Sequence, residues 1–276
     1  MPEARVMTGK VTPALSGVSL TEPEIEAMDR LERVRGVGGM KAALLALLLS
    51  PALPARLGAW REETALLPDA EAIRADVEKL GPSTRLPWFE LLLARMGASP
   101  LGDRQALLRS ARRVLAPPAL PIDRLLWLAM RRQFGEHPPT RAHGPDDPEI
   151  SRLSIADVLH VAHFTAHLAR MVPSGDPAQG QAWYQLVMSR WLKPGETPAW
   201  QRPDVDVLVH ALNGLQAMSW MQRPQVVRTW VAAALQVGAT RSLMPGAADA
   251  LRLSSLLLDS PMPPDLARHY AEIDPD

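Results

Sequence analysis

Four side chains able to bind a metal or carry a proton lie on one predicted helix in the second half of this 276-residue chain. They are Asp157, His160, His163 and His167, at spacings of three, three and four residues. On a helix of about 3.6 residues per turn, these spacings bring neighbouring histidines within reach of one ion, with the carboxylate nearby. Imidazole and carboxylate groups are zinc ligands, so the spacing supports a metal-binding or enzymatic face.

The same helix has a simpler interpretation, in which the histidines line its polar flank and need no ligand. The apolar residues that would then pack inward are Ile155, Leu159, Ala162 and Ala166. The chain contains no cysteine that could complete a zinc site. The sequence therefore favours the simpler interpretation, and it predicts neither a tight transition-metal site nor any other cofactor.

A second group of side chains suits anions. Residues 104–132 contain seven arginines and one acid, an excess of six positive charges in a chain whose net charge is zero. Such a stretch can meet phosphates or an anionic lipid surface. The candidate residues are Arg104, Arg109, Arg112, Arg113, Arg124, Arg131 and Arg132. The alternative is a solvated outer face, because arginine supplies most of the basic residues of this chain.

Aromatic and catalytic patterns narrow the function further. Only Trp127 interrupts the basic stretch, so nucleic acid, which stacks on aromatic rings, is not an expected partner. The chain lacks the HExxH, Walker A and GxSxG motifs as well as cysteine. These absences make an enzyme the less favoured class.

The tryptophans divide into two groups. Trp88, Trp127, Trp220 and Trp230 fall on apolar stripes and are predicted to lie in the core. Trp200, in a proline-rich loop, is the tryptophan expected to face outward toward a partner.

The elements that must position these residues are helices. Apolar residues recur at a period near 3.6 in at least eight segments, and none alternates as a strand does. We therefore expect an all-α fold of about 12 helices in tandem modules. Residues 1–20 form a flexible tether, 21–134 a first module, 135–152 a Pro/Gly-rich linker and 153–272 a second module. The longest apolar run, at residues 42–49, is too short to span a bilayer.

An internal repeat supports two modules. A shift of 119 residues places Leu93 on Leu212 and Arg104 on Arg223, and Pro121 and Pro245 each open a leucine-rich helix after an irregular joint. Two helix starts also carry capping-box patterns: Thr21 with Glu24, and Ser154 with Asp157.

Three runs carry a resemblance to a known family. They are GMKAALLALLLSP (39–51), LPWFELLLARMGASPLGDRQALLRSARRVL with LPIDRLLWLAMRRQF (86–134), and residues 212–264, which end in LDSPMPP. Together they resemble the C-terminal cytosolic, TerB-like helical region of HtpX-like bacterial membrane zinc metallopeptidases. The peptidase domain, with its HExxH motif and membrane helices, has no counterpart here. The joints at 116–120 and 238–242 also lack the carboxylates that can bind metal in TerB-like repeats.

The resemblance implies a non-catalytic helical module that interacts with, or regulates, a membrane zinc-peptidase system. Its expected partners are a membrane metallopeptidase or another protein, and an anionic membrane surface. Its expected location is the cytoplasm, at the inner face of the bacterial membrane. Two alternatives stay open: a metal-binding or enzymatic protein using the histidine face, and a basic-patch binder of anionic lipid or nucleic acid.

Overall fold

The computed structural model of the chain describes residues 18–116, 120–135, 153–193, 195–238 and 242–273. Within these ranges the fold is all-α, with thirteen helices and no β-strand. The predicted all-α class is confirmed, with about the number of helices expected. The predicted tether and linker lie outside the described residues, except for residues 18–20 and 135.

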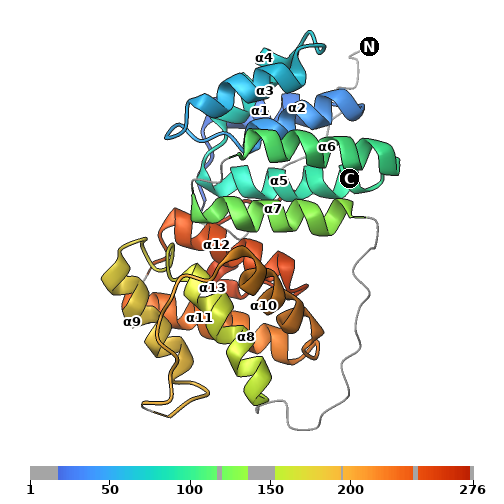
Figure 1. The fold of residues 1–276 in the computed structure, drawn as a ribbon. Coiled ribbons are helices and arrows are strands. Elements are labelled where there is room, and N and C mark those ends of the chain that lie inside the picture. The colour runs from blue at the N-terminus through green and yellow to red at the C-terminus, as the bar shows by residue number, and fades with distance from the viewer. Residues whose placement is uncertain (1–17, 117–119, 136–152, 194, 239–241, 274–276) are drawn as a thin grey trace.

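The first half contains seven helices, and α3, α4, α5 and α6 pack on α2 (Figure 1). The seven helices are α1 (Glu22–Glu32), α2 (Val37–Leu47), α3 (Ala55–Thr64), α4 (Ala70–Lys79), α5 (Pro82–Gly97), α6 (Leu101–Val114) and α7 (Pro121–Phe134). Helix α2 contacts α3, α4, α5 and α6, and every residue from Ala42 to Leu48 is buried. A helix that is apolar on all sides belongs in such a position.

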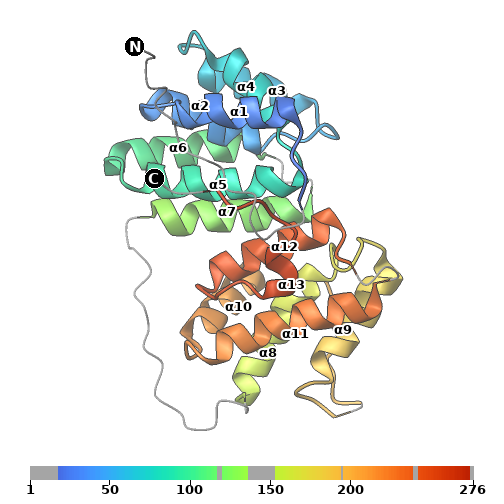
Figure 2. The same cartoon turned by 180° about the vertical axis from the view of Figure 1, so that it is seen from behind.

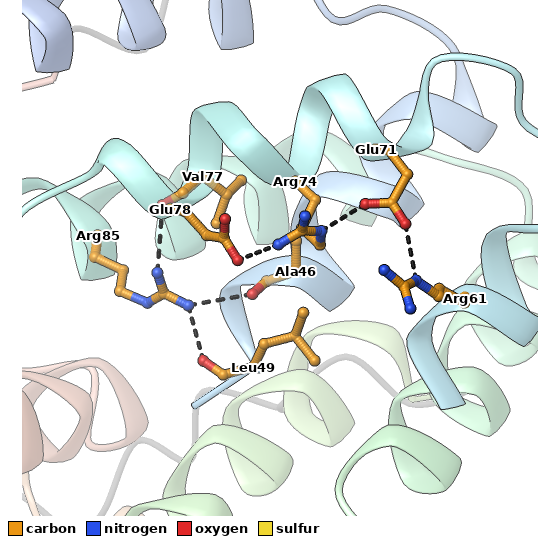
Figure 3. Close-up of polar contacts among 8 residues, drawn as sticks. All are labelled: Ala46, Leu49, Arg61, Glu71, Arg74, Val77, Glu78 and Arg85. Carbon is orange, nitrogen blue, oxygen red and sulfur yellow. Dashed lines mark hydrogen bonds and ion pairs between the residues drawn. The ribbon is translucent and has the colours of Figure 1, made fainter. Parts of the chain in front are cut away.

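One arginine joins the end of α2 to α5. Arg85 donates to the carbonyl oxygens of Ala46 at 3.1 Å and Leu49 at 2.9 Å, and to Val77 of α4 at 3.3 Å (Figure 3). The last carbonyls of a helix have no partner within the helix, so this guanidinium supplies the missing hydrogen bonds. Burial lowers the pKa of Arg85.

The ion pairs beside Arg85 lie at the surface. Glu71 of α4 accepts from Arg61 of α3 at 2.9 Å and from Arg74 at 2.7 Å (Figure 3). More than half of the Arg61 and Glu71 side chains is exposed. Exposed pairs of this kind contribute about 0–1 kcal/mol each, so they add little to the stability of the half.

The second half contains six helices. They are α8 (Ile155–Leu168), α9 (Pro177–Met188), α10 (Val205–Ala217), α11 (Gln222–Val237), α12 (Pro245–Leu257) and the short α13 (Pro264–Ala267). The indoles of Trp183 and Trp230 are fully buried between them, and both are hydrogen-bonded: Trp183 donates to the carbonyl of Trp230 and Trp230 to the hydroxyl of Thr165. Satisfied indole N–H groups make these large side chains well suited to a core.

The halves meet where α7 packs against α12 (Figures 1 and 2). Each of these helices begins with a proline, Pro121 or Pro245, in its first turn. In the sequence repeat each of these prolines opens a leucine-rich helix, and the structure brings the two helices into contact. Among the described helices, none combines the length and apolar character needed to cross a bilayer.

The two predicted capping boxes have different outcomes. Ser154 and Asp157 form one at the start of α8, as predicted. Thr21 makes no side-chain cap bond at the start of α1, so that prediction is wrong. Its proposed partner, Glu24, is buried and instead accepts hydrogen bonds from the backbone N–H of Gly81 and the hydroxyl of Thr84, at the start of α5. Burial against α5 gives the carboxylate stronger partners than its own helix offers.

A buried ion pair joins α7 to α3 within the first half. Arg56 of α3 and Asp123 of α7 are 5% and 1% exposed, and Arg56 Nη1 donates to Asp123 Oδ1 at 3.0 Å. The same carboxylate accepts from the backbone N–H of Leu120 at 2.7 Å and caps α7. Breaking such a pair leaves an unpaired buried charge.

We expect Asp123→Ala to lower the free energy of unfolding by about 3–5 kcal/mol, because Arg56 stays buried without its counter-ion and α7 loses its cap. Urea denaturation followed by circular dichroism measures this change. The exposed Asp29→Ala serves as the control and should change stability by about 0.5 kcal/mol or less. A loss no larger than that of the control would contradict the structural role of the pair.

Candidate binding sites between the two halves

The four predicted metal ligands have separate roles. Asp157 accepts from the backbone N–H and the hydroxyl of Ser154 at 3.2 and 2.7 Å. His163 is exposed, and the half-buried His160 meets His210 of α10 edge-on, with ring centroids 5.0 Å apart. Among the described residues, no three His, Asp or Glu side chains lie close enough to share a metal ion. Metal binding by only one or two of these side chains stays open as the alternative that the sequence offered.

His167 is fully buried, whereas the sequence placed it on a polar flank. Its Nε2 donates to the carbonyl of Pro121 at 3.1 Å, which ties α8 to the first turn of α7. Burial lowers the pKa of His167 to about 4, and the positive charges of Arg170 and Arg124 add to the effect. At neutral pH the ring is therefore uncharged and serves as a link between the halves.

Of the four apolar residues of α8 that were predicted to pack inward, two are buried and two are exposed. Ala162 and Ala166 are buried, but Ile155 is 85% exposed and Leu159 44% exposed. Helix α8 is covered mainly by α10 and contacts α9, and this arrangement turns His167 inward and leaves its first turn uncovered. Sequence periodicity cannot reveal which side of a helix its neighbours occupy.

The basic stretch does not act as one surface, because two of its arginines bridge the halves. Arg124 donates to the carbonyl of Pro203 at 3.3 Å. Arg132 donates to the carbonyls of Leu256, at 2.8 Å, and Leu257. These carbonyls end α12, where a cation is favourable.

The other five arginines of the stretch lie in the first half. Arg113 pairs with Glu63 at 2.6 Å, and Arg104 is half-buried. Arg109, Arg112 and Arg131 are exposed. Binding of an anionic surface by this stretch stays a prediction, and the exposed arginines are the ones free to take part in it.

A groove of about 520 Å³ lies beside the α7–α12 contact. Its walls come from α5, α7, α10, α11 and α12, so both halves contribute. Apolar side chains include Leu93 and the 38%-exposed Leu256, while Gln133 and Asn213 are exposed amides. The groove thus combines apolar surface with hydrogen-bonding groups.

Both arginines of the groove are fixed at the end of α12. Besides Arg132, the side chain of Arg223 donates to the carbonyl of Leu258 at 2.7 Å, and Gln216 donates to that of Leu257 at 2.8 Å. Burial lowers the pKa of Arg132. The negative charge of Asp259 opposes this shift, and the positive charge of Arg223 adds to it. The groove therefore has a rigid polar end.

The remaining charged wall of the groove belongs to a network. Glu90 of α5 accepts two hydrogen bonds from Arg252 of α12, both at 2.8 Å. The guanidinium of Arg252 lies 4.3 Å from the ring centre of Tyr270, whose hydroxyl donates to Asp249 at 2.9 Å. Burial raises the pKa of Asp249 to about 6. This network is a further polar link between the halves.

A second cavity of about 400 Å³ lies near the start of α7, lined by Pro121, Arg170, Gly175, Pro177, Trp200 and Arg202. Of these lining residues, the sequence predicted a role in binding only for Trp200. Arg170 and Arg202 are isolated in the sequence and lie far from the basic stretch, so no local signal marked them.

Two of the tryptophan predictions change. Trp200 is half-buried and donates to the carbonyl of Ala166 at 3.1 Å, so it is a wall of the second cavity and not a projecting side chain. Trp220, predicted to lie in the core, is 68% exposed in the joint between α10 and α11. Trp88 and Trp230 are buried and Trp127 is half-buried, as expected for core positions.

Comparisons with known proteins do not extend this picture. No protein-family model, curated protein or solved structure matches the chain. The resemblance to the TerB-like region of membrane peptidases therefore stays a prediction from the sequence.

We expect His167 to make the free energy of unfolding fall at acidic pH. Its pKa is about 4 in the folded chain and about 6.5 when unfolded, so its contribution is complete above pH 6.5 and is lost as the pH falls toward 4. The loss should reach about 3 kcal/mol. His167→Gln retains an N–H donor for Pro121 but cannot titrate. The difference in unfolding free energy between wild type and variant should change between pH 6.5 and 4, and a constant difference would contradict the assignment.

Asp249 should show the opposite dependence. Its pKa is raised from 3.8 to about 6, so its contribution is complete below pH 3.8 and is lost as the pH rises through 6, by about 3 kcal/mol. Relative to Asp249→Asn, the wild type should lose stability from pH 4 to pH 6. Chemical denaturation at stepped pH measures the difference. The exposed Asp265→Asn is the control, and an Asp249→Asn profile parallel to the wild type would count against the buried carboxyl.

Proposed function

We propose that this chain is a non-catalytic helical interaction module whose groove between α5, α7, α10, α11 and α12 binds a polypeptide segment of a partner protein. The observation that carries the proposal is the composition of the groove. Exposed amides of Gln133 and Asn213 can bond to the backbone of a bound segment, and Leu93 and Leu256 can receive an apolar side chain.

The charges of the groove also suit a polypeptide. The two negative charges of Glu90 and Asp259 balance the two positive charges of Arg132 and Arg223, so the lining carries no net formal charge. A groove of this kind does not select a small ion. It suits a segment with polar groups of both kinds, of which a peptide backbone has one of each per residue.

A non-catalytic role agrees with how the reactive side chains are used. Asp157 caps a helix, His167 holds the carbonyl of Pro121, and Glu63 binds three groups of neighbouring elements. Glu63 keeps its charge because hydrogen bonds from Ser110, Arg113 and Lys41 outweigh burial and lower its pKa to about 2. Side chains committed in this way maintain the fold and are not free for proton transfer.

The partner class follows from the resemblance to the C-terminal region of membrane zinc metallopeptidases. We propose that the module acts on such a peptidase system, in the cytoplasm at the inner face of the bacterial membrane. The exposed arginines Arg109, Arg112 and Arg131 could then face anionic lipid.

A peptide-display selection against the purified chain tests the groove. Enriched peptides should bind in solution, and Asn213→Trp should weaken them by about tenfold or more because an indole fills the groove. The matched control is Gln236→Trp, an exposed position of α11 outside the groove lining. Fluorescence anisotropy measures the affinities. Equal binding by both variants, or no enriched peptide, would overturn the proposal.

A further inference from the structure

Three arginines gather around the second cavity. Arg170 follows α8, Arg202 precedes α10 and Arg124 belongs to α7, so they come from three separate parts of the chain. Arg170 and Arg202 line the cavity. Arg124 donates to the carbonyl of Pro203, the residue after Arg202, and its charge acts on Arg170. Tertiary packing thus creates a concentration of positive charge that no segment carries alone.

No carboxylate neutralises this cluster within the described residues. Burial lowers the pKa of Arg170, and the neighbouring charges that act on it, Arg202 and Arg124, lower it further. Like charges held together in this way destabilise one another unless an anion joins them. The cluster is therefore prepared for a negative ligand.

The nearest acids in the chain are committed elsewhere. Asp176, next to two lining residues, accepts from the backbone N–H of Gln179 at 3.0 Å and caps α9. Asp204, two residues after Arg202, accepts from the N–H of Val207 at 2.8 Å and caps α10. N-capping carboxylates are also stabilised by the helix dipole, so turning toward the arginines would cost both helices their caps.

The other walls of the cavity are apolar. They are the rings of Pro121, Pro177 and Trp200, and the indole is held in place by its bond to Ala166. A cavity of about 400 Å³ is several times larger than an inorganic phosphate ion needs, and it lies in the range of small-molecule sites. An aromatic wall next to guanidinium groups favours a flat ring attached to an anionic group.

We propose that this cavity binds a small organic phosphate, with the phosphate on Arg170 and Arg202 and a planar ring against Trp200 and the two prolines. The site is separate from the groove and does not depend on peptide binding there. Because Pro121 belongs to the first half and the other lining residues to the second, the bound ligand bridges the two halves.

Isothermal titration calorimetry with phenyl phosphate, inorganic phosphate and phenol tests the site. Phenyl phosphate should bind, inorganic phosphate should bind at least about tenfold more weakly, and phenol should not bind measurably. Arg202→Gln, at an exposed position that should not disturb folding, should weaken phenyl phosphate by about tenfold or more through loss of a charged hydrogen bond. Arg109→Gln, an exposed arginine of α6 outside the cavity, should leave the affinity unchanged.

Each component of the proposal can fail separately. Equal affinity for phenyl phosphate and inorganic phosphate would overturn the ring contact. If Arg202→Gln and Arg109→Gln weaken the binding of phenyl phosphate equally, the anion is attracted to positive charge in general, and the proposed site is wrong. No binding of phenyl phosphate at millimolar concentration and low salt would overturn the proposal as a whole.

Discussion

The rest of this structure depends on the position of α7, which makes buried contacts with α3 of its own half and with the second half. Asp123 binds Arg56 within the first half, and two residues before it the carbonyl of Pro121 accepts a hydrogen bond from the ring N–H of His167 in the second half. At the other end of the helix, Arg132 holds the end of α12. Both cavities lie along this line of contacts, so their shapes depend on where α7 lies.

Arginine has a consistent structural use in this chain. Arg85, Arg132 and Arg223 donate to carbonyls at or just beyond the ends of α2 and α12. A planar guanidinium has several donors in a fixed geometry, so one side chain can satisfy two or three carbonyls that the helix leaves unpaired. Against this background Arg170 is distinctive, because it lines a cavity and the neighbouring charges that act on it, Arg202 and Arg124, are all of its own sign.

The two proposed sites use different chemistry for different ligands. The groove has charges of both signs, exposed amides and leucine side chains, which suit a peptide. The cavity has positive charge and rigid rings, which suit an anion with a flat body. Each is lined by residues of both halves, so ligands at either site would favour the packed arrangement of the two halves over any opened one.

Local patterns were sufficient to predict the helices, since a period of 3.6, prolines at helix starts and the Ser154–Asp157 box act within a few residues. They also placed Trp88 and Trp230 in the core, where both are buried. These properties depend on the order of residues along one helix, which the sequence states directly.

Contacts between distant segments decided the rest. The burial of His167, the exposure of Trp220 and the turn of Glu24 toward Thr84 depend on which helix covers which face. The meeting of Arg124, Arg170 and Arg202 depends on the packing of α7, α8 and the segment before α10. The sequence by itself determined that the chain is all-α. Only the tertiary structure placed the cavities, because a binding site is made of side chains brought together across space.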